Sequence, residues 1–313
     1  MKILFFGTSF VSKVYLENLY KNNHKFFIVT MPDKCFLRHR KPTYYQSVKI
    51  YAIENNISFV QPEKFTDDTI NRIKNFAPDI GIVVAYSKII PKIIFNIPRY
   101  RTFNIHFSLL PKYKGAAPVQ WALYNGECET GVSSFYISER LDAGDIIIQE
   151  KININMKDNA KTLFDKLIPL GIDIMNETIK LEQTALLNSK PQVGHSSFAP
   201  ILKKNNGLVD WSKDAHNIYN QFRGLYLWPG IYSIIPHGKL SGKMIKFIEI
   251  EIFDDTLINK DFGKICSVEK HKGFTISCAV GKILVIKLQL ENKRIMSAWD
   301  FIQGRQLFIN DHF

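Results

Sequence analysis

Residues 79–86, "DIGIVVAY", decide the fold, because they form the most apolar strand-sized run in the chain. Such a run is typical of a strand covered on both faces, at the centre of a parallel sheet. Predicted strands and helices alternate around it. The strands are expected at residues 2–7, 26–30, 57–62, 102–107, 130–137 and 145–154, and the helices at residues 11–20, 45–55, 66–76 and 161–187. This alternation predicts the α/β class, with a doubly wound domain whose site lies beyond the carboxyl ends of its strands.

The pattern of the sequence changes towards the C-terminus. Residues 189–209 contain Pro, Gly, Ser and Asn, and we expect them to link a domain of residues 1–188 to a domain of residues 210–313. The C-terminal part has one predicted helix near residues 213–223, and otherwise short strands separated by turns. Short strands of this kind are typical of a small all-β barrel.

The composition limits the possible partners. The 313 residues carry a net charge of +12, with +7 before residue 201 and +5 from that residue onward. A basic charge in both halves favours a polyanionic partner such as nucleic acid, although a genome rich in Lys, Asn and Ile codons explains it equally well. Scattered cysteines argue against a zinc site or disulfides and predict a cytoplasmic protein. No apolar run is long enough to cross a membrane, so no membrane association is expected, and nothing demands more than a monomer.

A polar pair stands at the end of one predicted strand. Asn104 and His106 are two residues apart and therefore share one face of that strand. At a strand end they can face a cleft, although a lone histidine in such a place is more often structural. The turn "RLDAGD" (140–145) then adds Asp142 and Asp145. Asp-x-Gly is common turn chemistry, but a carboxylate near a histidine orients the ring and favours its protonated form.

An amide, an imidazole and a carboxylate together can stabilise an oxyanion and move a proton. No Ser or Cys stands where His106 would activate it, which favours direct transfer between two bound substrates over a covalent intermediate. The segment "FFGTSF" (5–10) has a single glycine and matches neither a dinucleotide-binding nor a P-loop motif. We therefore expect no nucleotide cofactor.

The long stretch "FNIHFSLLPKYKGAAPVQWALYNGECETGV" (103–132), followed by "RLDAGDII" (140–147), resembles the folate-dependent formyltransferase family. The segment "VVAYSKIIPK" (83–92) is similar to the folate-cleft strand and loop of that family. The segments "LVDWS" (208–212), "RGLYLWPG" (223–230) and "KRIMSAWDFIQG" (293–304) resemble a member that formylates an amino acid carried by tRNA. The resemblance covers nearly the whole chain. It implies a Rossmann-like formyltransferase domain followed by an OB-like barrel that binds tRNA.

The resemblance also implies substrates and roles. Asn104, His106 and Asp142 would be catalytic. Asp145 matches a family position too, but we expect its role to be structural, as an acidic residue that satisfies backbone donors of the turn. The donor would be 10-formyltetrahydrofolate, with no metal, and the acceptor the α-amine of methionine esterified to initiator tRNA. The implied folate site is lined by Ser108, Leu109, Leu110, Pro111, Ala85 and Tyr86. The implied tRNA contacts lie in the basic loop 31–45, at Lys34, Arg38, Arg40 and Lys41. Phe107 departs from the family pattern, which is small at this position, and leaves the shape of the folate pocket open.

Two other functions remain open. A formyltransferase that acts on a nucleotide-linked amino sugar would use the same Asn, His and Asp. A non-enzymatic RNA-binding protein built on a basic barrel would need none of these residues and would bind no folate.

Overall fold

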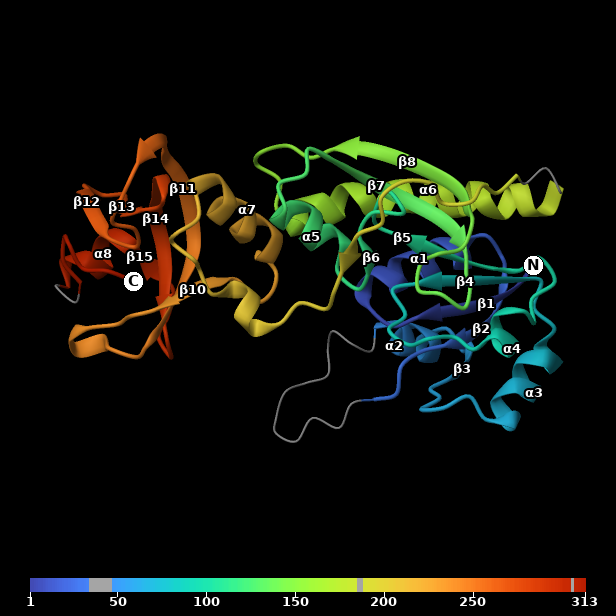
Figure 1. Cartoon of the computed structure of the whole chain (residues 1–313). Coiled ribbons are helices and arrows are strands. Elements are labelled where there is room, and N and C mark those ends of the chain that lie inside the picture. The colour runs from blue at the N-terminus through green and yellow to red at the C-terminus, as the bar shows by residue number, and fades with distance from the viewer. Residues whose placement is uncertain (34–46, 185–187, 305–306) are drawn as a thin grey trace. The chain divides into compact units, whose positions relative to one another are not determined.

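The structure is a computed structural model that describes residues 1–33, 47–184, 188–304 and 307–313 (Figure 1). The chain divides into two compact units. The first comprises Met1–Pro118, Glu129–Ile152 and Asp165–Pro200, and the second comprises Val119–Cys128, Asn153–Phe164 and Ile201–Phe313. The second unit thus takes two segments from before residue 165, which a single boundary in the sequence does not capture. The predicted domain limits at residues 188 and 210 stay a prediction.

A seven-stranded sheet is the centre of the first unit, with the order β3-β2-β1-β4-β5-β7-β8. Its strands are β1 (Lys2–Gly7), β2 (Lys25–Val29), β3 (Ser58–Val60), β4 (Ile80–Val84), β5 (Thr102–His106), β7 (Glu129–Tyr136) and β8 (Ile146–Asn153). Strands β3, β2, β1, β4 and β5 pair in parallel, whereas β7 runs antiparallel to β5. The most apolar run of the sequence, β4, lies in the middle of this order, as predicted.

Helices pack on both faces of this sheet. They are α1 (Phe10–Lys21), α2 (Ser47–Glu54), α3 (Asp67–Phe76), α4 (Lys92–Phe95) and α6 (Ala160–Thr184). On one face, Ile73 of α3 and Ile94 of α4 join the buried cluster that contains Val83 of β4. On the other face, Gly171 of α6 lies against Tyr15 of α1 and Ile105 of β5. This arrangement is the doubly wound α/β architecture that the alternating pattern predicts.

Local signals explain where the helices begin. The hydroxyl of Thr66 accepts a hydrogen bond from the amide of Thr69 at 3.4 Å, which makes Thr66 the N-cap of α3. Ser9 caps α1 in the same way by accepting from the amide of Ser12. These contacts satisfy backbone donors that have no partner inside the helix.

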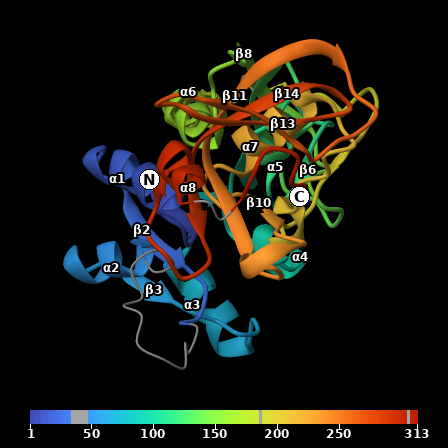
Figure 2. The same cartoon turned by 90° about the vertical axis from the view of Figure 1, so that its left-hand side faces the viewer.

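The second unit is built around an antiparallel sheet with the order β10-β11-β14-β13-β12, and β15 pairs with β14. Its elements are α5 (Pro118–Tyr124), α7 (Ala215–Leu225), β10 (Ile231–Ile234), β11 (Met244–Ile258), β12 (Ile265–Glu269), β13 (Gly273–Ser277), β14 (Val280–Leu290), β15 (Met296–Ser297) and α8 (Ala298–Gln303). In its core the Trp211 ring packs edge-on against Phe247, and its indole N–H donates to the Ser233 hydroxyl at 3.0 Å. Helix α8 packs on β13 and β14 (Figure 2). The small all-β domain is therefore confirmed as an antiparallel sheet domain.

The sequence pattern does not predict several short elements. Helices α5 and α8 are too short to show a helical period, since they span only two turns or fewer. The segment expected to be a plain linker, residues 189–209, contains strand β9 (Phe198–Ala199) and the 3₁₀ helix Lys204–Gly207. Strand β9 pairs in parallel with β6 (Lys114–Gly115), so this segment is attached to the loop that follows β5.

Candidate active site

The pair Asn104 and His106 lies in the C-terminal half of β5. Asn104 is the register partner of Val83 in β4, so its side chain belongs to the face of the sheet that carries α3 and α4. His106, two residues further on, shares that face. Ile105 points to the opposite face, beside Gly171 of α6. The strand therefore presents both polar side chains on one side, as predicted from their spacing.

The imidazole of His106 has a hydrogen-bond acceptor on each side. Its Nε2 lies 2.9 Å from the carbonyl oxygen of Tyr113, and because a carbonyl only accepts, Nε2 carries a proton. Its Nδ1 lies 3.9 Å from Oδ2 of Asp142. The ring is 5% exposed and packs edge-on against Phe135. A carbonyl oxygen therefore faces one ring nitrogen and a carboxylate oxygen faces the other.

Asp142 reaches the site from a tight turn between β7 and β8. Its φ of 45° places it in the left-handed region, and its Oδ2 accepts a hydrogen bond from the amide of Gly115 at 2.8 Å. Gln192 donates from Nε2 to the carbonyl oxygens of Asp142 and Gly144, at 2.9 and 2.8 Å. The backbone carbonyl of Asp145, the second acidic residue of the turn, accepts a hydrogen bond from the amide of Tyr136. The turn is therefore held by side-chain and backbone contacts on several sides.

The amide of Asn104 is not saturated. Its Oδ1 atom is buried and has no hydrogen-bond partner among the described residues. A buried polar atom without a partner costs about 1–3 kcal/mol, so such atoms in proteins usually await a ligand or a water molecule. The Oδ1 atom can therefore accept a hydrogen bond from a bound substrate or a water molecule, whereas donation to a substrate falls to the Nδ2 group of the same amide. Together with His106 and Asp142 it forms the polar set that the sequence predicts.

The residues predicted to line a folate site lie in two loops that follow β4 and β5. Ser108 is fully buried, and its hydroxyl donates to the carbonyl of Lys112 at 2.6 Å, within its own loop. Leu110 is buried, whereas Leu109 and Pro111 are half-buried. After β4, Ala85 is exposed with a φ of 48°.

Tyr86 follows Ala85, and its ring packs edge-on against Phe6. Its hydroxyl is buried with no partner in the described part of the chain, and burial raises the pKa of Tyr86 to about 12. The phenol therefore stays protonated at neutral pH, as a donor that is still available.

Phe107 does not line the face that carries His106. Its ring is buried and packs edge-on against Tyr15 of α1, with the ring centroids 6.3 Å apart. The Tyr15 hydroxyl in turn donates to the carbonyl of Ile168 in α6 at 3.2 Å. The large side chain is accommodated in the core between β5, α1 and α6.

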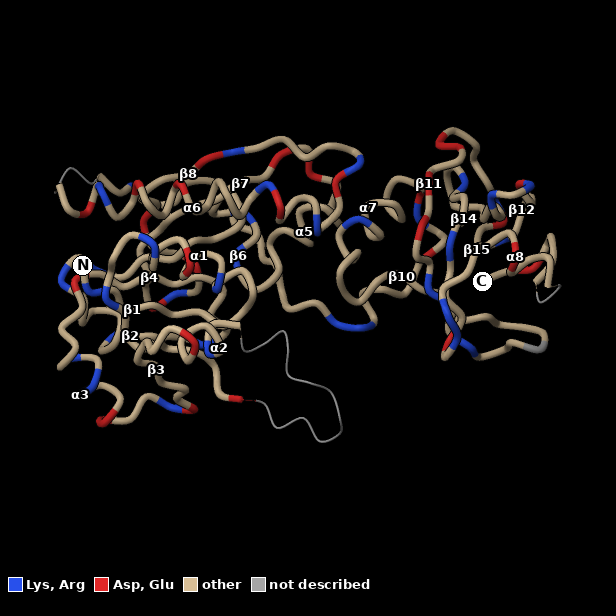
Figure 3. The backbone as a smooth tube through the Cα atoms, turned by 180° about the vertical axis from the view of Figure 1, so that it is seen from behind, with Lys and Arg blue, Asp and Glu red and all other residues tan. Residues whose placement is uncertain are grey.

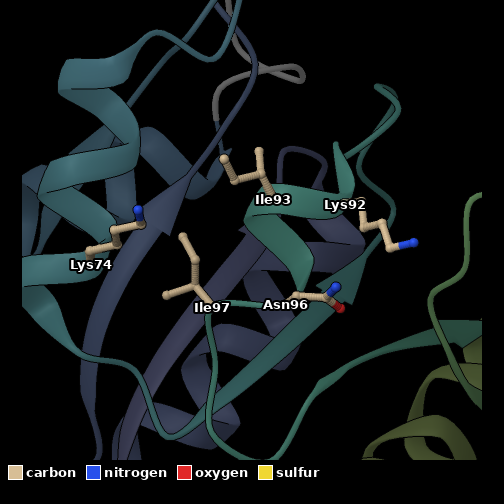
Figure 4. Close-up of a pocket in the computed structure, with 5 residues that line it drawn as sticks. All are labelled: Lys74, Lys92, Ile93, Asn96 and Ile97. Atoms are coloured by element: carbon tan, nitrogen blue, oxygen red, sulfur yellow. The ribbon is translucent and has the colours of Figure 1, made fainter.

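Two hollows lie near these elements. One, of about 480 Å³, is bordered by the turn that carries Asp142 and is lined by Lys92, Phe95, Asn96, Arg101, Thr102, Ile137, Ser138, Glu139, Arg140 and Ala143. The other, of about 660 Å³, lies between α3 and α4 and is lined by Lys74, Lys92, Ile93, Asn96 and Ile97 (Figure 4). The polar set is absent from the lining of both. The first hollow has a size typical of small-molecule sites.

The remaining predictions concern tRNA contacts, metal sites and membrane-spanning helices. The predicted tRNA contacts Lys34, Arg38, Arg40 and Lys41 lie outside the described residues. Within the described ranges, no group of three or more His, Cys, Asp or Glu side chains is placed to hold a metal ion. No helix in those same ranges is long and apolar enough to cross a membrane. Lys and Arg alternate with Asp and Glu along both units (Figure 3).

Sequence reasoning missed three residues of this site. The carbonyl of Tyr113, the side chain of Gln192 and the side chain of Ser197 all support the polar set, and Ser197 accepts from the amide of Tyr113 at 2.9 Å. The first is a backbone group, and the other two lie in the segment expected to be a linker. No pattern in the sequence marks them, because their role depends on contacts with distant residues.

Known proteins resemble this chain over its full length. The "Formyl transferase" family profile matches residues 1–179, and the profile "Formyl transferase, C-terminal domain" matches residues 201–306. The methionyl-tRNA formyltransferase of Endomicrobium trichonymphae is 64% identical over 313 residues, 100% of both chains. The methionyl-tRNA formyltransferase of Thermodesulfovibrio yellowstonii is 39% identical over 307 residues, 97% of this chain and 96% of the relative.

A solved structure shows the same fold. It is the N-formyltransferase of Helicobacter canadensis in complex with folinic acid and dTDP-3-aminofucose, with a TM-score of 0.67 and 21% identity. The match covers 91% of this chain and 98% of that one. With both family profiles matched and an identity of 64% held from end to end, the chain belongs to the formyl transferase family.

Proposed function

We propose that this protein transfers a formyl group from 10-formyltetrahydrofolate to the α-amine of methionyl initiator tRNA. The observation that carries the proposal is the placement of His106, between the carbonyl of Tyr113 and the carboxylate of Asp142, beside the unsaturated amide of Asn104. The two relatives that match the whole chain bear the name of this activity.

The reaction passes through a tetrahedral oxyanion. The α-amine of an amino acid titrates near ~8, and its ester lowers that value further, so much of the acceptor is neutral at pH 7. Its nitrogen attacks the formyl carbon, a carbon–nitrogen bond forms, and the carbonyl oxygen becomes negative. We assign the stabilisation of this oxygen to the Nδ2 group of Asn104 and to the Nδ1 proton of the protonated His106 ring, because Nε2 of that ring already donates to the Tyr113 carbonyl. Preorganised donors of this kind are effective because they need no rearrangement as the charge develops.

Collapse of the intermediate needs a proton. The bond between the formyl carbon and the folate N10 breaks as N10 accepts a proton, and the attacking amine loses one. Asp142 keeps the imidazole charged and relays the proton through water, since its Oδ2 lies 3.9 Å from Nδ1 of His106, too far for a direct hydrogen bond. The proton lost by the amine is thus balanced by the proton gained by N10, and no covalent enzyme intermediate is needed.

Substrate binding is assigned to three regions. The folate is held by Ser108, Leu109, Leu110, Pro111, Ala85 and Tyr86. Initiator tRNA is held by the basic loop with Lys34, Arg38, Arg40 and Lys41 and by the domain of residues 210–313. The net charge of +12 suits a large polyanion. We further propose that the protein acts as a cytoplasmic monomer.

The test is a formyl-transfer assay with purified protein. Charged initiator tRNA and a nucleotide-linked amino sugar are offered in parallel with 10-formyltetrahydrofolate. We expect transfer to the tRNA substrate alone. Transfer to the sugar alone would assign the protein to the sugar-modifying branch of the family, and absence of transfer to both, with tRNA bound but no folate, would indicate an RNA-binding protein.

Variants then test the catalytic set. Asn104→Ala and His106→Ala should each lower kcat by about 10²–10³-fold, because each removes one donor to the oxyanion. Binding of tRNA should be unchanged in a filter-binding assay. A rate close to wild type in either variant would remove that residue from the mechanism.

A further inference from the structure

Residues 190–199, here named the brace, connect the two neighbours of the His106 ring. At its start, Lys190 exchanges backbone hydrogen bonds with Ile146, both at 2.8 Å, next to the Asp142 turn. At its end, the carbonyl of Ala199 accepts from the amides of Ala116 and Ala117. The brace is thus fixed at both ends to loops of the polar set. The composition of the brace is typical of a linker.

One side chain of the brace holds the Asp142 turn. Gln192 donates both hydrogens of Nε2, to the carbonyls of Asp142 and Gly144, at 2.9 and 2.8 Å. Because both partners only accept, the orientation of this amide is fixed by chemistry. Asp142, which supplies the first of these carbonyls, has a left-handed φ of 45°, a conformation that is unfavourable for a non-glycine residue. The two hydrogen bonds from Gln192 oppose its relaxation.

The same segment holds the other neighbour of His106. The hydroxyl of Ser197 accepts from the amide of Tyr113, and the Ser197 carbonyl accepts from the amide of Lys114, both at 2.9 Å. Tyr113, with a left-handed φ of 60°, then presents its carbonyl to Nε2 of His106. One segment therefore holds both the carbonyl that accepts from Nε2 and the turn whose carboxylate faces Nδ1.

We infer that Gln192 is a positioning residue for formyl transfer, which sets the Asp142 carboxylate relative to His106 through the backbone of its turn. The inference rests on the proposed function, since the rate of formyl transfer is its readout. Gln192 has no role in the folate or tRNA sites proposed above, so its loss should change the chemical step more than substrate binding. A shift of about 1 Å in a catalytic group costs up to about 10²-fold in rate.

The experiment compares three variants of the full chain. Gln192→Met keeps the size of the side chain and removes the donors. Gln192→Glu places an acceptor before two carbonyls at neutral pH and regains one donor when protonated. Gln183→Met, the same change at an exposed position of α6, is the matched control. For each variant, kcat, KM for both substrates, the pH profile and the melting temperature are measured.

We expect kcat of Gln192→Met to fall by about 10–10²-fold, with both KM values within a few fold of wild type. Gln192→Glu should lose more at neutral pH and recover relative to wild type as the pH falls, a response that a purely structural role would not give. A kcat near wild type in Gln192→Met, or a rise in KM alone, would overturn the inference. Inactive wild-type protein would instead refute the proposed function.

A double-mutant cycle separates an effect that acts through Asp142 from a general loss of stability in the variants. If Gln192 acts through Asp142, Gln192→Met should cost little in an Asp142→Asn background, because the carboxylate it positions is already gone. An equal factor in both backgrounds would show that Gln192 acts elsewhere and would contradict the inference.

Discussion

At the scale of single residues, the site depends on which atoms surround the His106 ring. An imidazole has two nitrogens, and here each meets an oxygen that only accepts, from Tyr113 and from Asp142. Asn104 adds a neutral amide, whose Nδ2 group donates and whose buried Oδ1 is an unpaired acceptor in the described part of the chain. A charged donor and a neutral donor on one face suit an oxygen that becomes negative during the reaction.

Asp142→Asn tests the charge of the carboxylate separately from its shape. The amide keeps an oxygen for the Gly115 N–H but loses the negative charge that faces Nδ1. We expect kcat near neutral pH to fall by about 10²–10⁴-fold, the range for loss of a proton-transfer group. Asp145→Asn, three residues along the same turn, is the control and should stay within a few fold of wild type. Retained activity in Asp142→Asn would show that the charge is not needed.

At the scale of elements, β5 directs its polar and apolar side chains to opposite faces of the sheet. Asn104 and His106 point to one face, while Ile105 meets α6 on the other and Phe107 packs against Tyr15. The close approach of α1 to α6 depends on Gly171, since a methyl group there would overlap the hydroxyl of Tyr15. The rigidity of β5 thus rests partly on a helix contact behind it.

Gly171→Ala tests that contact. The added methyl should lower the free energy of unfolding by about 1–3 kcal/mol, because the packed side chain must move. Urea denaturation measures the change. In a Tyr15→Phe background, which lacks the overlapping hydroxyl, the cost of Gly171→Ala should be smaller. Equal costs in the two backgrounds would show that the Tyr15 hydroxyl is not what limits this position.

At the scale of the whole molecule, charge distinguishes the two substrates. The net charge of +12 is spread over both parts of the sequence, so attraction to a polyanion does not depend on a single tail. Each phosphate neutralised by Lys or Arg releases condensed counterions, which makes binding to a nucleic acid depend on salt. A small folate ligand makes few such contacts.

Affinity for initiator tRNA should therefore fall by about 10-fold or more between ~50 and ~200 mM salt. Fluorescence titration of labelled tRNA measures this dependence, and calorimetry with a folate analogue at the same salt concentrations is the control, for which we expect little change. A tRNA affinity that is flat over this range would contradict the electrostatic part of the proposed function.

The sequence by itself determined the parts of this protein that follow from local periodicity. The alternation of strands and helices, the central position of β4, the cap at Thr66 and the common face of Asn104 and His106 all follow from short-range sterics and side-chain spacing. These features are predictable because they depend on residues a few positions apart. The motif around Asn104 and the Asp142 turn also indicated the family.

Only the tertiary structure decided how the distant parts meet. It brings Asp142 to Nδ1 of His106, turns the carbonyl of Tyr113 to Nε2, and attaches a segment that resembles a linker to both loops through Gln192 and Ser197. It also places Phe107 in the core. Hydrogen bonds between residues far apart in the chain leave no periodic pattern and no distinctive composition in the sequence. They depend on where packing places two backbones, which the local pattern does not record.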